Sequence, residues 1–160
     1  MAGAPPATSR PARRSRSTTR PASRPCPGEA TAMLLVKTYL DRSPIAGVGL
    51  FAAEPIPAGT LVWKLSDVDI VIHQRDLDAQ GLTDLQRAFF ESHAYKNGNT
   101  YYLCIDDARF MNHSRDANTH ENGQSSIASR QIEAGQEITC NYGNFDDSKR
   151  HLEYCQPKDA

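Results

Sequence analysis

The chain has 160 residues, a length that suits one domain with a tail. Lysine and arginine (18) nearly balance aspartate and glutamate (19), which argues against a protein that binds nucleic acid along its whole length. This overall balance conceals an uneven distribution of charge along the chain. Residues 1–30 carry six arginines and one glutamate, a net +5, and residues 31–160 carry 12 basic and 18 acidic residues, a net −6. An acidic body favours a cationic partner.

The first 30 residues are predicted to be a disordered basic tail. They lack Leu, Ile, Val, Phe, Tyr and Trp and hold six of the ten prolines, so they cannot bury enough apolar area to offset the entropy of ordering. They have no apolar run typical of a secretory signal, and their prolines prevent the amphipathic helix of an organelle transit peptide. Two interpretations of this tail stay open, contact with nucleic acid and a plain solvated leader.

The cysteines indicate a reduced setting. Cys26, Cys104, Cys140 and Cys155 form no CxxC pair, and no secretory signal accompanies them, so we expect an intracellular protein. The cytoplasm of a bacterium, a nucleus or an organelle would suit it, and no apolar run is long enough to span a membrane. A zinc site from the last three cysteines and His113 is an alternative, but buried free thiols and no metal are favoured because the ligands are scattered.

The body, residues 31–160, is predicted to be mainly β. Short apolar or alternating runs bounded by Gly, Pro or Asn-Gly predict strands at residues 33–39, 60–65, 68–72, 101–105, 127–129 and 138–142. Two helical segments interrupt them. One is a turn over 73–80 closed by Gly81, and the other is a helix over 83–94.

The helix over 83–94 has the clearer signals. Thr83 and Gln86 have the spacing of a capping box, and Leu85, Phe89 and His93 repeat every four residues. This pattern predicts an amphipathic helix.

Three motifs carry the candidate chemistry. The first is Gly47-Val48-Gly49 and the apolar residues after it, where paired glycines allow a ligand to approach the backbone closely. The second, residues 109–118 (RFMNHSRDAN), gathers amide side chains that can donate and accept hydrogen bonds. The third, residues 137–143 (EITCNYG), puts a tyrosine at a strand end. Taken alone, each also fits a plain turn, a self-bonded loop or a packing residue.

In this order the motifs resemble those of the SET-domain family of protein lysine methyltransferases, from Met33 to Phe145. The resemblance implies a β-fold of several short sheets, with a pseudoknot formed by the last two motifs. Residues 68–99 would be the family's variable insert, and residues 144–160, or another chain, would close the substrate channel. The implied activity is transfer of a methyl group from S-adenosylmethionine to a lysine side chain of a histone or another basic protein. A catalytically inactive SET-like interaction module is the alternative.

The resemblance also assigns roles to residues. It implies that the cofactor is bound by Gly47, Val48, Gly49, Asn112, His113 and Phe145. The glycines and His113 would act mainly through their backbone and Asn112 through its side chain, and Phe145 or Tyr154 would stack on the adenine.

Three further residues are expected at the lysine. Tyr142 is the expected catalytic residue, orienting the amine, and either Tyr101 or Tyr102 would wall the channel because alternation puts only one of them on a given face. Cys140 stands where the family often has Phe or Tyr. The smaller side chain predicts a product that is not confined to monomethyl-lysine.

The sequence departs from the family pattern at Arg115 and Ala117, where cysteine and proline are common, and it lacks the C-terminal cysteine cluster. A metal-linked version of that loop is therefore not expected. The oligomeric state stays open.

Overall fold

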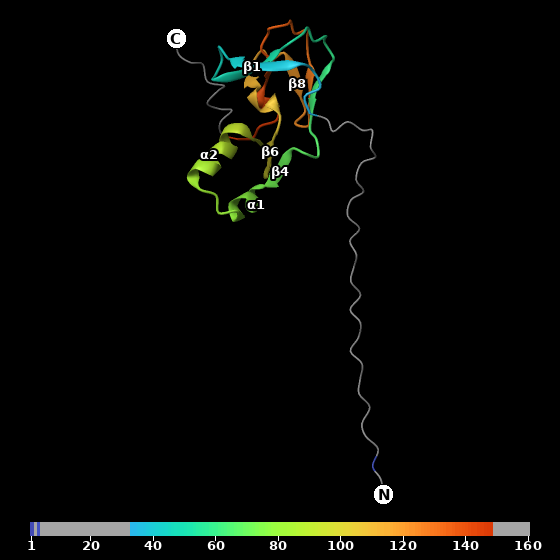
Figure 1. The fold of residues 1–160 in the computed structure, drawn as a ribbon, viewed down its shortest axis with the longest axis vertical. Coiled ribbons are helices and arrows are strands. Elements are labelled where there is room, and N and C mark those ends of the chain that lie inside the picture. Colours follow the sequence, from blue (N-terminus) through green and yellow to red (C-terminus); the bar gives the residue numbers. More distant parts are fainter. Residues whose placement is uncertain (2, 4–32, 149–160) are drawn as a thin grey trace.

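A computed structural model describes residues 1, 3 and 33–148 of the chain (Figure 1). Its strands are β1 (Thr38–Arg42), β2 (Val48–Ala52), β3 (Leu61–Lys64), β4 (Ile70–His73), β5 (Tyr95–Asn97), β6 (Thr100–Leu103), β7 (Asn112–His113), β8 (Thr119–Glu121), β9 (Ser125–Ala128) and β10 (Thr139–Cys140). The helices are α1 (Gln74–Ala79) and α2 (Asp84–His93), with 3₁₀ turns at Asp107–Phe110 and Tyr142–Asn144. Nearly all of the predicted tail, residues 149–160 of the expected closing segment, Cys26, Tyr154 and Cys155 lie outside the described residues.

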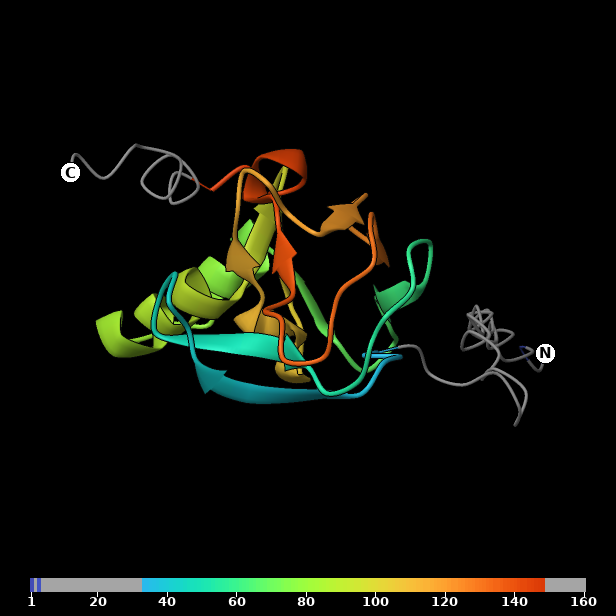
Figure 2. The same ribbon diagram turned by 90° about the horizontal axis from the view of Figure 1, so that it is seen from above.

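The strands form four small sheets. Two of them are three-stranded, in the orders β3-β9-β8 and β4-β6-β5, and two are pairs, the antiparallel hairpin β1-β2 and the parallel pair β7-β10. Both α-helices lie at one side of the molecule (Figures 1 and 2), and Figure 1 shows them below the β1-β2 hairpin. The fold of the described part is therefore mainly β with a helical insert, which confirms the predicted fold class.

The core lies among the β2, β3 and β9 strands and the segment that leads into β10. Leu50, Ile56, Val62, Ile132 and Ile138 are each no more than 1% exposed. Backbone hydrogen bonds join these distant segments, because Ile138 N donates to Leu50 O at 2.7 Å and Ile56 N to Ile132 O at 2.8 Å. The core thus ties residues around 50 to residues around 138, which places the first and third motifs side by side.

The helix predicted over 83–94 is confirmed, but its apolar stripe does not pack as expected. Thr83 and Gln86 form the capping box, with each side chain accepting from the other residue's backbone N–H. No residue of α2 is buried, and Leu85 is 83% exposed. Phe89 stacks on His93 with ring centroids 4.7 Å apart, so two members of the repeat pack against each other within the helix. Local capping chemistry fixes where this helix starts, whereas its packing depends on segments far away in the chain.

The strand predicted over 33–39 is wrong in position. Leu34 makes only a single bridge to Trp63, and the strand runs over Thr38–Arg42. Its limits are set by its partner, because Thr38 pairs with Ala52 and Arg42 with Val48 around the turn that contains Gly47. Apolar character alone misplaced this element. No helix among residues 33–148 has the length and apolar character needed to cross a bilayer.

Candidate active site

The second and third motifs meet in the parallel pair β7-β10. Asn112 is opposite Thr139 and His113 is opposite Cys140, and Ser114 N donates to Cys140 O at 2.9 Å. Residues nearly 30 positions apart in sequence therefore lie next to each other.

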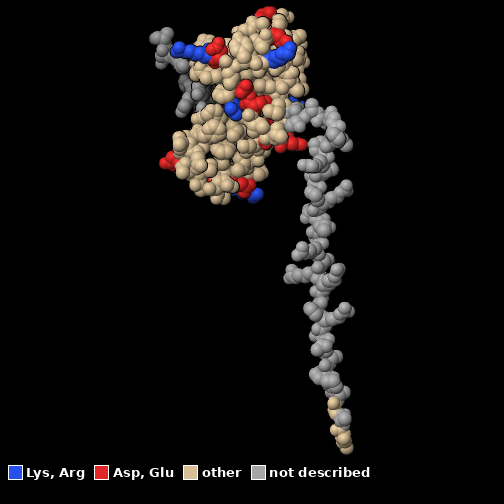
Figure 3. Space-filling view, viewed as in Figure 1, with Lys and Arg blue, Asp and Glu red and all other residues tan. Residues whose placement is uncertain are grey.

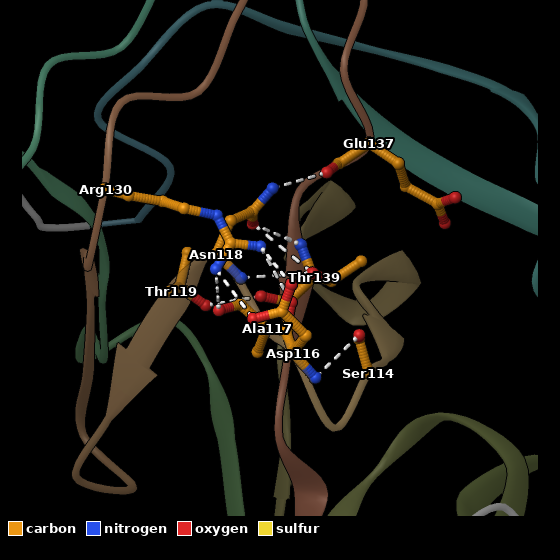
Figure 4. Close-up of polar contacts among 8 residues, drawn as sticks. All are labelled: Ser114, Asp116, Ala117, Asn118, Thr119, Arg130, Glu137 and Thr139. Atoms are coloured by element: carbon orange, nitrogen blue, oxygen red, sulfur yellow. Dashed lines mark hydrogen bonds and ion pairs between the residues drawn. The ribbon is translucent and has the colours of Figure 1, made fainter.

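The other side of β10 is held by the loop that follows β7 (Figure 4). Asn118 is fully buried, and its Oδ1 accepts from Thr139 N at 2.9 Å while its Nδ2 donates to Glu137 O at 2.8 Å. Thr119 Oγ1 donates to Thr139 O at 2.8 Å. The segment 137–140 is thus enclosed between β7 and the loop, as a pseudoknot of these two motifs requires.

The side chain of Asn112 joins the first motif to the others. Its Nδ2 lies 3.1 Å from both Ala46 O and Val48 O and 2.8 Å from Glu137 Oε1, so three acceptors share the two protons of one amide. Ser43 Oγ donates to the same Glu137 oxygen at 2.8 Å. One amide and one carboxylate therefore fix the turn between β1 and β2 against the strand that leads to the tyrosine.

The two glycine positions of the first motif require glycine for different structural reasons. Gly47 has φ +51°, and a side chain there would meet no atom within 4 Å, so the left-handed backbone is what requires glycine. At Gly49 a Cβ would lie 2.3 Å from Glu137 Oε1. Gly47 and Val48 line the cavity described below, and Gly49 instead makes room for the Glu137 carboxylate.

Tyr142 is oriented from both of its ends. Its backbone N–H donates to His113 Nδ1 at 3.1 Å, and its hydroxyl donates to Met111 O at 2.9 Å. His113 is buried, and because Nδ1 accepts, its neutral ring carries the proton on Nε2. The His113 side chain thus positions the tyrosine, while its backbone forms the β7-β10 pair.

All three motifs line one cavity of about 400 Å³, within the size range of small-molecule sites. Its walls include Ala46, Gly47, Val48, Arg109, Phe110, Met111, Asn112, Cys140, Tyr142 and Phe145. Phe145 lies edge-on to the ring of Tyr142, with centroids 6.1 Å apart. The structure thus brings most of the residues expected at the site to one space.

A tyrosine that sequence reasoning missed lines the cavity. Tyr95 on β5 is in the wall, whereas Tyr101 and Tyr102 are not. Tyr102 stacks behind Tyr95 with centroids 4.9 Å apart, and Tyr101 lies under Lys96 Nζ at 5.3 Å. The Tyr95 hydroxyl donates to the Gly123 carbonyl, and burial raises the pKa of that phenol. The Asn-Gly turn at 97–98 was the usable signal, because a hairpin there pairs Tyr95 with Tyr102.

The cavity wall also holds two buried cysteines. Burial raises the pKa of both Cys104 and Cys140, so each is a neutral thiol that packs as a small apolar side chain. The Cys140 Sγ lies 3.7 Å from Met111 O. Within residues 33–148, no three His, Cys, Asp or Glu side chains gather as metal ligands would.

Comparison with known proteins agrees with this geometry. The SET domain family matches residues 47–143, which is more than half of the chain. Among solved structures, the chain is similar to a humanised mutant of the Chaetomium thermophilum Polycomb Repressive Complex 2 bound to the inhibitor GSK126, with 21% identity, 71% of this chain covered and a TM-score of 0.51. An apo form of ctPRC2 with two substitutions in Ezh2 gives 23% identity, 70% coverage and a TM-score of 0.54.

These likenesses concern the fold, and the chain spans only 16% of the length of either solved chain. No curated protein matches by sequence. The match to the family model includes Gly47-Val48-Gly49, Asn112 and Tyr142, and most of the residues that line the cavity. The chain therefore belongs to the SET domain family, whose members are typically protein lysine methyltransferases.

Proposed function

We propose that this protein transfers a methyl group from S-adenosylmethionine to a lysine side chain of a basic protein such as a histone. The observation that carries this proposal is the meeting of three separate motifs around one cavity, with the Tyr142 hydroxyl fixed in its wall by Met111 O at 2.9 Å. The Asn-His motif binds both the hydroxyl and the backbone N–H of Tyr142, so the ring is held in one orientation at the cavity.

The residues present suit the cofactor. The cavity has an amide side chain at Asn112, exposed backbone at Gly47 and Val48, and aromatic rings at Phe110 and Phe145. These groups would hold the amino-acid part and the adenine of S-adenosylmethionine, which supplies an electrophilic methyl group on a sulfonium. Asn112 is already bound to the backbone of Ala46 and Val48, so it would position the cofactor-binding turn as well as contact the cofactor.

The chain's own residues prepare the amine. A free lysine has a pKa of about 10.4, and the nucleophile must be the neutral form. Burial in a cavity walled by Tyr95, Cys140 and Tyr142 disfavours the ammonium and lowers that pKa. The Tyr142 hydroxyl donates its proton to Met111 O, so its oxygen remains an acceptor that can orient the amine for in-line transfer.

A methyl-transfer assay tests the proposal. With labelled S-adenosylmethionine and core histones or lysate proteins, Tyr142→Phe should lose transfer by about 100-fold, because misplacing the amine costs that much. Cofactor binding and thermal unfolding should stay close to those of the unmodified chain. Tyr101→Phe, which alters a tyrosine outside the cavity, is the matched control and should keep full activity.

The same assay separates the alternative of an inactive interaction module. Such a module would bind the cofactor without transferring the methyl group, or would bind no cofactor at all. Transfer by Tyr142→Phe at the rate of the unmodified chain would overturn the role of the tyrosine.

A basic substrate is favoured by charge. Residues 33–148 carry 16 acidic and nine basic side chains. Figure 3 shows a small group of acidic side chains near the middle of one face, and other acidic and basic side chains scattered around it. Complementary charge increases the rate of encounter with a lysine-bearing protein. We also propose that the protein acts inside the cell, where such substrates are found.

A further inference from the structure

One wall of the cavity is a row of three polar side chains that the three motifs do not include. In the sheet β3-β9-β8, Trp63 is opposite Ser126, and Ser126 is opposite Glu121. Residues opposite each other across a sheet share a face. All three are at most 6% exposed, and all three line the cavity. The row therefore places Trp63, Ser126 and Glu121 together in one wall of the cavity.

Two members of this row have unused hydrogen-bonding capacity. The Nε1 of Trp63 is buried and has no hydrogen-bond partner among the described residues. The Glu121 carboxyl accepts from Asn141 N at 3.3 Å, and its other oxygen lies beside the Thr119 hydroxyl. A carboxylate has about four acceptor positions, and the hydrogen bonds among the described residues do not fill all of them. Buried polar groups are normally satisfied, and Glu121 lines the cavity, so this carboxyl can accept from a polar guest there.

The Glu121 carboxyl lies beside the tyrosine motif. Its bond to Asn141 N joins it to the residue directly before Tyr142. Its charge also acts on the Cys140 thiol, which it helps to keep protonated. A substrate amine that reaches Tyr142 and Cys140 therefore enters the space that the carboxyl faces.

We propose that Glu121 accepts the proton that the substrate lysine must lose before methyl transfer, an inference that rests on the proposed function. An N–H bond of the ammonium breaks, and an O–H bond forms on the carboxylate. The nitrogen lone pair so released forms the new C–N bond to the methyl carbon while the C–S bond breaks and its electron pair goes to sulfur. The proton leaves Glu121 for solvent after the product departs, so one proton is released per methyl group.

The location suits this transfer. Burial disfavours both charged forms, so it raises the pKa of a carboxyl and lowers that of an ammonium, and both changes favour moving the proton from nitrogen to oxygen. Burial does raise the pKa of Glu121, against the opposing hydrogen bonds from Thr119 and Asn141 N. A base whose pKa approaches the working pH is the more effective one.

Other titratable groups surround this carboxyl, and the test must separate them from it. They are His120 on its own strand, Tyr95, Cys104, Cys140, Tyr142 and Asp146. Tyr95, Cys104 and Cys140 are neutral near pH 7, because burial raises the pKa of each. Asp146 accepts three hydrogen bonds, from Lys96 N at 3.0 Å, from Ser148 N at 2.9 Å and from the Ser148 hydroxyl at 2.8 Å.

The pH dependence of transfer by the full chain gives the first test, with core histones as the probe. Glu121→Gln keeps an oxygen for Asn141 N but removes the proton acceptor, so transfer at pH 7 should fall by about 100-fold. The loss should shrink to about threefold near pH 10, where lysine increasingly enters as the neutral amine. A structural defect would not be rescued by pH. Glu121→Asp should recover part of the rate, and Glu133→Gln, which alters an exposed glutamate, should change nothing.

A spectroscopic measurement tests the proton transfer without turnover. In the full chain labelled with ¹³C at glutamate carboxyls, the signal lost in Glu121→Gln identifies this residue. Adding n-butylammonium at pH 7 should move that signal toward the protonated position. No movement, or movement toward the ionised position, would overturn the inference.

The two proposals fail in different ways. If the unmodified chain transfers no methyl group, the proposed function fails, and the carboxyl signal still reports on Glu121. If the unmodified chain is active and Glu121→Gln is equally active at pH 7, the proposed function stands and the role of Glu121 is wrong.

Discussion

At the scale of single residues, the site depends on a few side chains that each hold two segments. Glu137 accepts from both Asn112 and Ser43, and His113 accepts the backbone N–H of Tyr142. The glycine at position 49 is needed because the Glu137 carboxylate occupies the space a Cβ would take. Residues that a motif would assign to ligand contact thus also assemble the site from distant parts of the chain.

Cys140 should set how many methyl groups are added. Its side chain is small, buried and in the cavity wall, so room remains beside the amine for a methyl group. Mass spectrometry of the products should therefore find di- or trimethyl-lysine, and Cys140→Tyr should shift the products toward monomethyl-lysine. Thermal unfolding of the variant controls for the cost of a larger core side chain, which is typically about 1–3 kcal/mol. Monomethyl-lysine alone from both forms would contradict this role.

The sequence predicts those site residues that belong to a short local motif. It does not predict those whose place in the cavity wall depends on the register of strand pairing. Asn112, Tyr142 and Cys140 were found because each belongs to a short pattern. Tyr95 was missed because its place in the wall follows from pairing with Tyr102 across a hairpin. Glu121 reaches the cavity only through the pairing of β8 with β9, which no short pattern in the sequence reveals.

At the scale of elements, α2 contacts the rest of the domain through its last turn, where His93 lies edge-on to Phe110 and lines the cavity. Its start is fixed by the Thr83–Gln86 capping box, yet it buries no residue. The two ends of its chain segment are anchored instead, because β4 and β5 both pair with β6. Sequence periodicity predicted the helix correctly, but an apolar repeat says nothing about whether another segment covers it.

Thr83→Ala should loosen α2 without unfolding the domain. Loss of an N-cap costs about 0.5–2 kcal/mol, and a helix without buried residues can open locally. Hydrogen exchange of the backbone amides at 84–87 should speed up, while the midpoint of global thermal unfolding should move little. Thr60→Ala, which alters a threonine outside the helix, provides the comparison. A large drop in the global midpoint for Thr83→Ala would mean that α2 is part of the cooperative core.

At the scale of the whole molecule, the charge of the domain matters more than the net charge of the chain. The near-zero total of the chain hides an excess of acidic over basic side chains in residues 33–148. Exposed charges more than about 10 Å apart are screened at 0.1 M salt, so this excess acts mainly on encounter with a partner.

Salt should therefore slow methylation of a basic protein. Between about 50 and 300 mM salt, kcat/KM for core histones should fall several-fold through KM, because screening weakens long-range attraction. The rate with n-butylamine, a probe with one charge, should change much less. An equal response of both substrates would show that the charge of the domain does not recruit its partner.

The row that contains Trp63 has one more consequence. This residue is the only tryptophan of the chain, and it lies in the cavity wall, 4% exposed. When the protein is excited at a wavelength that only indole absorbs, its fluorescence therefore comes from a single position beside the proposed site. Any molecule that enters the cavity beside Trp63 changes the surroundings of that one fluorophore, so the protein carries its own optical probe of occupancy and needs no added label.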